Sequence, residues 1–118
     1  MIRIDRGDFD PKNGRFRYFV CFVDNEVGKD DVHQRVPVEV AVSVSENGDL
    51  ADFTFQLPKV CRTDTALALL RTEPTASHVD SRVFVSIPGL SGDVVISSAA
   101  ELQMDAAGRI LGINIHPF

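Results

Sequence analysis

The stretch Met104-Asp105-Ala106-Ala107-Gly108-Arg109-Ile110-Leu111-Gly112-Ile113-Asn114-Ile115 decides the predicted fold, because it has a counterpart earlier in the chain. That counterpart is Val44-Ser45-Glu46-Asn47-Gly48-Asp49-Leu50-Ala51-Asp52-Phe53-Thr54-Phe55. The two segments align without a gap, since Gly48 and Gly108 lie 60 residues apart and the apolar core positions coincide. A repeated pattern of this kind predicts two copies of one structural unit.

Alternating apolar residues lead into each of these segments. The alternating positions are Val36, Val38, Val40, Val42 and Val44 in the first copy, and Val94, Ile96, Ala100, Leu102 and Met104 in the second. Apolar side chains at a period of two predict a strand that is buried on one face. The many valines favour the same prediction, because β-branched side chains suit a pleated surface better than a helix.

A glycine turn and a bulge are expected in each hairpin. Asn47-Gly48 and Ala107-Gly108 separate the apolar runs, and glycine adopts the positive φ that a tight hairpin needs. After each turn the alternation shifts by one residue. This shift predicts β-bulges at Ala51-Asp52 and at Leu111-Gly112.

Another strand is expected ahead of each hairpin, at Phe16–Val23 and at Val83–Ile87, and Ile2 and Ile4 suggest a short edge strand. The segment from Asp64 to Arg71 is rich in alanine and leucine, so we expect a short helix with Asp64 as its N-cap and Pro74 beyond its end. The remaining connections are a long polar loop at 24–37, a polar linker at 75–81 and a short glycine-rich turn at 88–93.

The predicted fold is therefore α+β and mainly β, with two three-stranded β repeats that share one core and one short helix between them. The repeats are assigned to 1–58 and 82–118, and the helix-containing connection to 59–81. With 118 residues and 44% hydrophobic residues, the chain has the size and composition of a single domain covering 1–118. Two separate domains of half this length would each bury only about 60% of their unfolded surface.

Charge and cysteine usage limit the expected partners and compartment. The net charge is −5, which argues against nucleic acid or an anionic membrane as the main partner. Residues 1–17 nevertheless carry a net charge of +2. Cys21 and Cys61 are too few and too far apart for a disulfide framework or a metal motif, so we expect reduced, buried thiols. The charged N-terminus and the absence of a long apolar run predict a cytoplasmic protein without a secretory signal or membrane span.

The pattern of Asp105, Gly108, Arg109, Gly112 and Ile113 resembles the closing hairpin of a family of short bacterial proteins, a domain of unknown function of the DUF2283 type. That family follows Asp-x-x-Gly-(Arg/Lys/Asn)-(Leu/Ile/Val)-x-Gly-Ile-(Glu)-(Ile/Leu). The resemblance covers about the second half of the chain, with the first half similar to a divergent second copy. It departs from the pattern at Asn114, where an acidic residue is usual, and at Asp52, which replaces the second glycine in the first copy. The resemblance implies a fold and no activity.

The loop Asp24–His33 is the densest group of potential ligands, with Asp24, Glu26, Asp30, Asp31 and His33. Their spacing fits neither an EF-hand nor a zinc motif, so we interpret the segment as a solvated acidic loop and assign no metal. No cofactor is assigned either.

Nucleophiles give no catalytic assignment. Cys61 precedes the expected helix, whose N-terminus would lower a thiol pKa, whereas Cys21 lies in an apolar run and is expected in the core. The histidines that such a thiol would need as a base are dispersed at His33, His78 and His116.

The serines and the glycine-rich turn carry no recognised chemistry. No Gly-x-Ser-x-Gly elbow surrounds the strand serines, which are Ser43, Ser45, Ser97 and Ser98. The turn Pro88–Asp93 lacks the Lys-Ser/Thr of a phosphate loop. The group Arg15, Arg17 and Tyr18 has only a faint similarity to a nucleic-acid-binding stripe, and we interpret its arginines as exposed sheet residues.

The leading functional hypothesis is a non-enzymatic binding or regulatory module that acts through sheet edges or loops. Its partner is expected to be a protein, either another chain or a second copy in a homodimer, because exposed strand edges favour such pairing. The alternative is a small enzyme or ligand carrier with a pocket between the two repeats. Convergence of the polar loops Asp24–His33 and Thr75–Asp80 on one cavity would favour the alternative.

Overall fold

The computed structural model describes residues 2–10, 15–23, 27–46, 48–72, 76–79, 81–87 and 89–115. Within these ranges the chain is mainly β and has one α-helix, α1 (Asp64–Thr72), with two short 3-10 helices, η1 (Lys29–Asp31) and η2 (Lys59–Cys61). The strands are β1 (Arg3–Asp10), β2 (Arg15–Cys21), β3 (Gln34–Val44), β4 (Leu50–Gln56), β5 (Ala76–Val79), β6 (Arg82–Ser86), β7 (Val94–Met104) and β8 (Ile110–Ile115).

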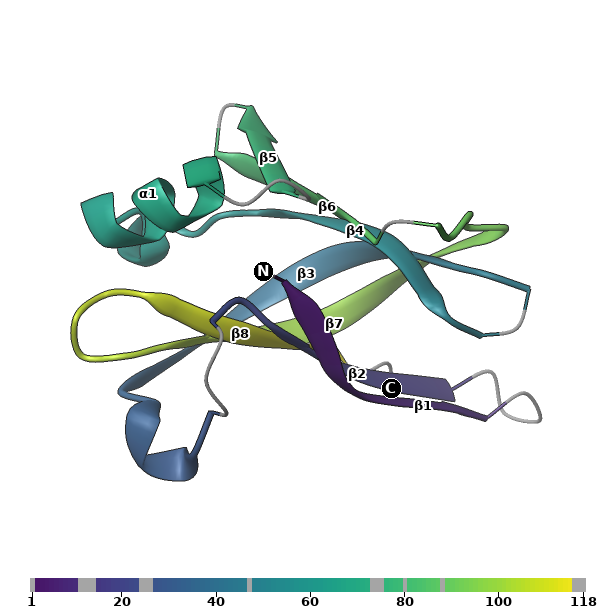
Figure 1. The fold of residues 1–118 in the computed structure, drawn as a ribbon, viewed down its shortest axis with the longest axis horizontal. Coiled ribbons are helices and arrows are strands. Elements are labelled where there is room, and N and C mark those ends of the chain that lie inside the picture. The colour runs from purple at the N-terminus through teal and green to yellow at the C-terminus, as the bar shows by residue number, and fades with distance from the viewer. Residues whose placement is uncertain are drawn as a thin grey trace.

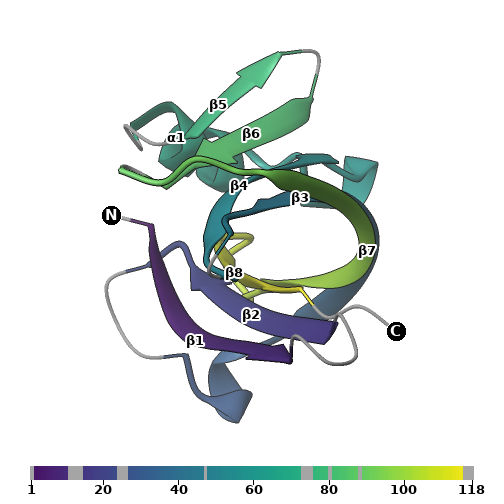
Figure 2. The same cartoon turned by 90° about the vertical axis from the view of Figure 1, so that its right-hand side faces the viewer.

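The described strands form one antiparallel sheet in the order β1-β2-β8-β7-β3-β4-β6-β5. Figure 2 shows that this sheet curls on itself, with β3 and β7 along its strongly curved part. These two long strands pair over their whole length, from Gln34 opposite Met104 to Val44 opposite Val94. The sheet therefore has its longest ladder at its centre and free edges at β1 and β5 (Figure 1).

Strands from the first half of the chain pair with strands from the second half. The early strand β2 pairs with β8, and β6 pairs with the early strand β4. Each half therefore completes the part of the sheet begun by the other half. This exchange depends on pairing between distant segments, which the local alternation of apolar residues does not specify.

The two glycine hairpins have the predicted turns and bulges. Gly48 and Gly108 both have φ 85°, and in each turn the glycine N–H donates to the carbonyl three residues earlier. The register shifts once in each hairpin, which leaves Ala51 as the extra residue on β4 and Leu111 as the extra residue on β8. Both extra residues are buried, so the bulges place two consecutive apolar side chains in the interior.

The polar linker predicted at 75–81 is wrong, because residues 76–79 form strand β5, paired with β6. The second half therefore begins one strand earlier than predicted and contributes four described strands where three were expected, whereas the N-terminal edge strand suggested by Ile2 and Ile4 is present as β1. An edge strand has a neighbour on one side only and does not need a continuous buried face. Its sequence can therefore lack the apolar alternation by which the other strands were predicted.

The helix forms where the sequence predicts it, but with a different N-cap. Helix α1 begins at Asp64, and the Thr63 hydroxyl accepts the N–H of Ala66 at 3.0 Å. Threonine is a favoured N-cap because its side-chain oxygen satisfies an N–H of the first turn that has no partner in the helix. Pro74 lies outside the described residues.

The buried side chains of both halves form one hydrophobic cluster. It extends from Ile2 to Ile115 and includes the buried faces of β3, β4, β7 and β8 together with Ala66 and Leu70 of α1. The helix is short enough to be marginal in isolation, and these two residues fix it against the sheet. Within the described part of the chain, no helix has the length and apolar character needed to cross a membrane.

Candidate functional site

The predicted acidic loop does not form a metal centre within the residues that the structure describes. Asp30 and Asp31 are exposed on η1, and the Asp31 carboxylate accepts the N–H of Gly28 at 2.9 Å. His33 is exposed immediately before β3, while Asp24 and Glu26 lie outside the described residues. Among described side chains, no group of three or more histidine, cysteine, aspartate or glutamate residues is placed to hold a metal ion.

Cys61 is a free, buried thiol, as predicted, and it does not gain the lowered pKa that a helix N-terminus can give. Cys61 lies in η2 and is fully buried, and this burial raises its thiol pKa. The 3-10 turn directs the side chain into the core, so desolvation opposes formation of the thiolate. Cys21 is also buried, as predicted, and its thiol donates to the Val23 carbonyl at 3.1 Å. The side chain of His78 and all of His116 lie outside the described residues.

The serines do not converge on a common reaction centre. The Ser45 hydroxyl accepts the N–H of Asp49 at 3.0 Å, so it supports the β3–β4 turn. The Ser98 hydroxyl donates to the Ala99 carbonyl at 3.0 Å. Ser43 is buried beneath the β6–β7 connection, and Ser97 is exposed on β7.

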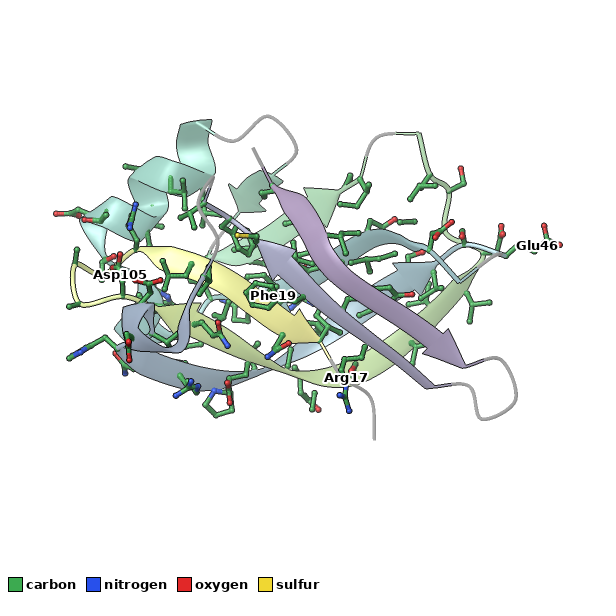
Figure 3. All side chains as sticks on the ribbon, turned by 60° about the horizontal axis from the view of Figure 1, so that its bottom comes forward. Arg17, Phe19, Glu46 and Asp105 are labelled. Carbon is green, nitrogen blue, oxygen red and sulfur yellow. The ribbon has the colours of Figure 1, made fainter. Side chains whose placement is uncertain are left out.

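The group Arg15, Arg17 and Tyr18 does not form a continuous surface. Arg17 is exposed, whereas Tyr18 is buried and its hydroxyl donates to the Gly48 carbonyl. Successive strand residues face opposite sides of a sheet, so this stripe divides between solvent and core; Figure 3 shows Arg17 pointing away from the sheet. The side chain of Arg15 lies outside the described residues.

A half-open groove of about 410 Å³ lies beside the first half of β3. Strand β4 pairs with β3 only from Val40 onward, so the residues of β3 before Val40 have β7 as their only neighbour among the described strands. The opposite charges of Glu39 and Arg82 both line this groove. Its full lining is Pro37, Val38, Glu39, Val40, Ala41, Gln56, Pro58, Arg82 and Ser97, which come from both halves of the chain.

A second candidate surface, which we name the apolar tip, is the end of the molecule that carries Leu90, Val94 and Val95; Val94 and Val95 point to opposite sides of β7 at its start. The exposed fractions of these three residues are 39%, 54% and 74%. They lie on the β6–β7 connection and the start of β7, at the end of the molecule that also carries the β3–β4 turn (Figure 1). The Asp93 N–H donates to the Val44 carbonyl at 2.9 Å, which fixes the connection to the end of β3.

The connection packs closely on the outer face of the sheet. A Cβ added to Gly92 would lie 1.6 Å from Ser43 Oγ, so the backbone at Gly92 rests directly on Ser43. Val95 is opposite Ser43 in the β3–β7 ladder, and Asp52 is opposite Ser43 in the β3–β4 ladder. Directly opposed residues share a face, so Val95, Gly92 and Asp52 surround Ser43 on one surface.

Carboxylates border the apolar tip. Glu46, Asp49, Asp52 and Asp93 are exposed, and Asp93 Oδ2 accepts the N–H of Glu46 at 3.1 Å. Figure 3 shows Glu46 at one end of the sheet and Asp105 at the other. The alternation of apolar residues does not predict this surface. The signal was present in the two consecutive valines Val94 and Val95, since only one of two neighbouring strand residues faces the core.

Comparisons with protein-family models, with curated proteins and with solved structures found no match to this chain. The class of protein is therefore defined by the chain's own structure. It is a mainly β protein with a curled antiparallel sheet and one described α-helix, and the apolar tip and the groove are its two candidate binding surfaces.

Proposed function

We propose that this protein is a non-enzymatic binding module that docks a protein partner through the apolar tip. The observation that carries the proposal is the exposure of Leu90, Val94 and Val95 within a few residues of one another. Exposed apolar side chains bordered by polar groups are typical of interaction sites, and here Val94 and Val95 offer one such side chain on each side of the start of β7. The tip includes the β6–β7 loop, and loops are one of the two kinds of surface, with sheet edges, that the binding hypothesis names.

We also propose that the chain consists of two diverged copies of one unit. The equal φ values of Gly48 and Gly108 and the single register shift in each hairpin support this proposal. The central ladder supports it further, because an offset of 60 residues converts the pair Gln34–Met104 into Val94 and Val44, which are themselves paired.

Under the proposed duplication, the fold does not require apolar residues at the exposed positions of the tip. At the same offset of 60 residues, the first copy has Asp30, Gln34 and Arg35 where the second has Leu90, Val94 and Val95. All three polar residues are exposed. Polar side chains are therefore compatible with these positions, and the apolar residues in the second copy are better explained by binding than by folding.

A cytoplasmic location and a shared hairpin are also proposed for this protein. Two free, buried cysteines support a reducing cytoplasmic location. The resemblance to the bacterial domain of unknown function supports a shared hairpin only, because Asp105 and Arg109 of its motif form an ion pair within the turn, with Nε 2.8 Å from Oδ2. The motif residues therefore stabilise the turn and add no site.

A ligand carrier is the second candidate function, and the groove beside β3 favours it. The groove lies between strands of the two halves, where the alternative hypothesis expects a pocket. Glu39 and Arg82 would offer a carboxylate and a guanidinium to a small ligand with both charges. Neither polar loop named in that hypothesis, Asp24–His33 or Thr75–Asp80, contributes a described residue to the groove.

Site-specific photo-crosslinking tests the binding proposal. A benzophenone amino acid replaces Val95 in one variant and Val60 in a matched control, because Val60 is 50% exposed on η2. In cells of the native host, the Val95 variant should yield a discrete higher-mass adduct that the Val60 variant lacks. Absence of an adduct, together with thermal stabilisation by a small ligand that Arg82→Gln abolishes, would instead support the ligand carrier.

A further inference from the structure

Resting on the proposed binding function, we infer that the partner of the apolar tip is a polypeptide segment whose apolar side chains are flanked by lysine or arginine. Two features of the tip lead to this chemistry. Its centre offers the exposed side chains of Leu90, Val94 and Val95, and its border consists of carboxylates.

The apolar centre selects for aliphatic or aromatic side chains in the partner. Val95 is the most exposed of the large hydrophobic residues in the described chain, at 74%. The backbone beneath it is well fixed, because Val95 lies in the β3–β7 ladder. In addition, the Asp93 N–H donates to the Val44 carbonyl and the Asp93 carboxylate accepts the N–H of Glu46. A fixed apolar surface loses little conformational freedom when a partner covers it, which favours binding.

The acidic border selects for basic flanking residues. No described cationic side chain forms an ion pair with Glu46, Asp49, Asp52 or Asp93; the ion pairs between described side chains join Arg35 to Glu101 and Arg109 to Asp105. Arg35 is opposite Gln103, near the β7–β8 turn that carries Arg109, so both arginines lie toward the other end of the central strands. Carboxylates without a cationic partner attract lysine or arginine and repel an acidic segment.

The charge of Asp49 already acts on a neighbouring group. Burial raises the pKa of the Tyr18 phenol, and the negative charge of Asp49 raises it further. The phenol donates a hydrogen bond to the carbonyl of Gly48, which precedes Asp49, so the negative charge of this carboxylate acts on the buried hydroxyl. The same charge is available to a cationic side chain that approaches from solvent, where salt would screen it.

Binding of three synthetic peptides of equal length tests the inference by nuclear magnetic resonance titration of the full chain. The first has an aliphatic core flanked by lysines, the second has the same core flanked by glutamates, and the third keeps the lysines but has serines in the core. We expect the first peptide to bind about tenfold more tightly than either of the others, and more weakly as salt increases. Its chemical shift changes should centre on residues 43–46 and 89–95.

Matched variants separate the contributions of the apolar centre and of the acidic border. The double variant V94S/V95S should abolish binding of the first peptide, whereas Val60→Ser should leave it unchanged. Asp52→Lys should remove the preference for lysine over glutamate flanks, whereas Asp30→Lys, which also reverses an exposed charge, should preserve it. Because all five substituted positions are exposed, the variants are expected to remain folded.

The inference is overturned if the three peptides bind equally, if the shift changes centre on another surface, or if V94S/V95S binds as the wild type does. Self-association of the wild type that V94S/V95S abolishes would also overturn it, since the occupant of the tip would then be a second copy of this chain. A crosslink at Val95 without any preference for basic peptides would reject the inferred partner chemistry and leave the binding function intact. A failure of both experiments would reject the binding function itself.

Discussion

The hydroxyl of Thr63 connects the start of α1 to the β7–β8 turn. It donates to the carbonyl oxygen of Gly108 at 2.7 Å and accepts the N–H of Ala66 at 3.0 Å. The turn of the other glycine hairpin has a similar bond, because the Tyr18 hydroxyl donates to the carbonyl of Gly48. A hydroxyl from outside the hairpin thus binds the glycine carbonyl in both turns.

Replacement of Thr63 by valine should destabilise the protein. Thr63→Val keeps the shape of the side chain but removes both the N-cap and the bond to Gly108. We expect the free energy of unfolding to fall by about 1–3 kcal/mol, the combined range for a lost cap and a lost hydrogen bond. Urea unfolding followed by circular dichroism measures this change. Thr63→Ser retains the hydroxyl and should remain much closer to the wild type; equal losses in both variants would contradict the assigned bonds.

Tyr18 should ionise at a higher pH than an exposed tyrosine, and its ionisation should destabilise the fold. Burial and the charge of Asp49 raise its pKa above the ordinary value of 10.0. The neutral phenol therefore contributes stability that is fully present below pH 10.0 and is lost as the pH rises through the folded-state pKa. Tyr18 is the one tyrosine in a chain without tryptophan, so the absorbance of ionised phenol reports on this residue alone.

The variant Tyr18→Phe provides the control for this pH dependence. It removes the bond to Gly48 and should cost about 1 kcal/mol at neutral pH. It also removes the titrating group, so its stability should decline less steeply than that of the wild type as the pH rises above 10.0. Parallel alkaline declines in the two proteins would show that another group causes the loss.

Gly112 should not tolerate a side chain. A Cβ at this position would lie 2.6 Å from the Val20 carbonyl oxygen and 2.8 Å from Cζ of the Phe19 ring. Gly112→Ala must therefore displace β2 from β8, and we expect it to lower the free energy of unfolding by about 1–3 kcal/mol. Removing the ring with Phe19→Ala does not remove the backbone contact. Gly112→Ala should consequently remain destabilising in the Phe19→Ala background. A double variant as stable as Phe19→Ala alone, or more stable, would contradict this geometry.

The sequence predicts those parts of the fold that depend on neighbouring residues. Gly48 and Gly108 have the expected positive φ, and Ala51 and Leu111 occupy the expected bulges, because turn chemistry and apolar alternation are local properties. Strand β5 was missed because an edge strand needs no alternation. The pairing of β2 with β8 was beyond prediction because it joins segments from opposite halves of the chain.

The candidate surface was missed for a different physical reason. Val94 and Val95 belong to a correctly predicted strand, and an apolar residue in a strand is ordinarily assigned to the core. Val94 lies on the alternating core face of β7, yet it is 54% exposed because it lies where the strand begins. Exposure at a strand end depends on how far the neighbouring segments extend, so it becomes visible only in the assembled sheet.

Asp105 should give the β7–β8 turn an acid-sensitive stability. Partial burial opposes its ionisation, but the side-chain hydrogen bond and charge of Arg109 and the N–H groups of Arg109 and Ala107 outweigh burial and lower its pKa below 3.8. The ionised carboxylate therefore contributes stability that is present above pH 3.8 and is lost as the pH falls through the lower, folded-state pKa. Asp105→Asn keeps a side-chain oxygen as acceptor but loses the charge, so we expect a loss of about 1 kcal/mol at neutral pH and a flatter acid limb in stability measured against pH. Ser45→Ala is the control, because it removes the uncharged acceptor of the other turn. Its free energy of unfolding should fall with decreasing pH as steeply as that of the wild type. A shallower fall in this variant as well would mean that the turns, rather than the charge of Asp105, set the acid sensitivity.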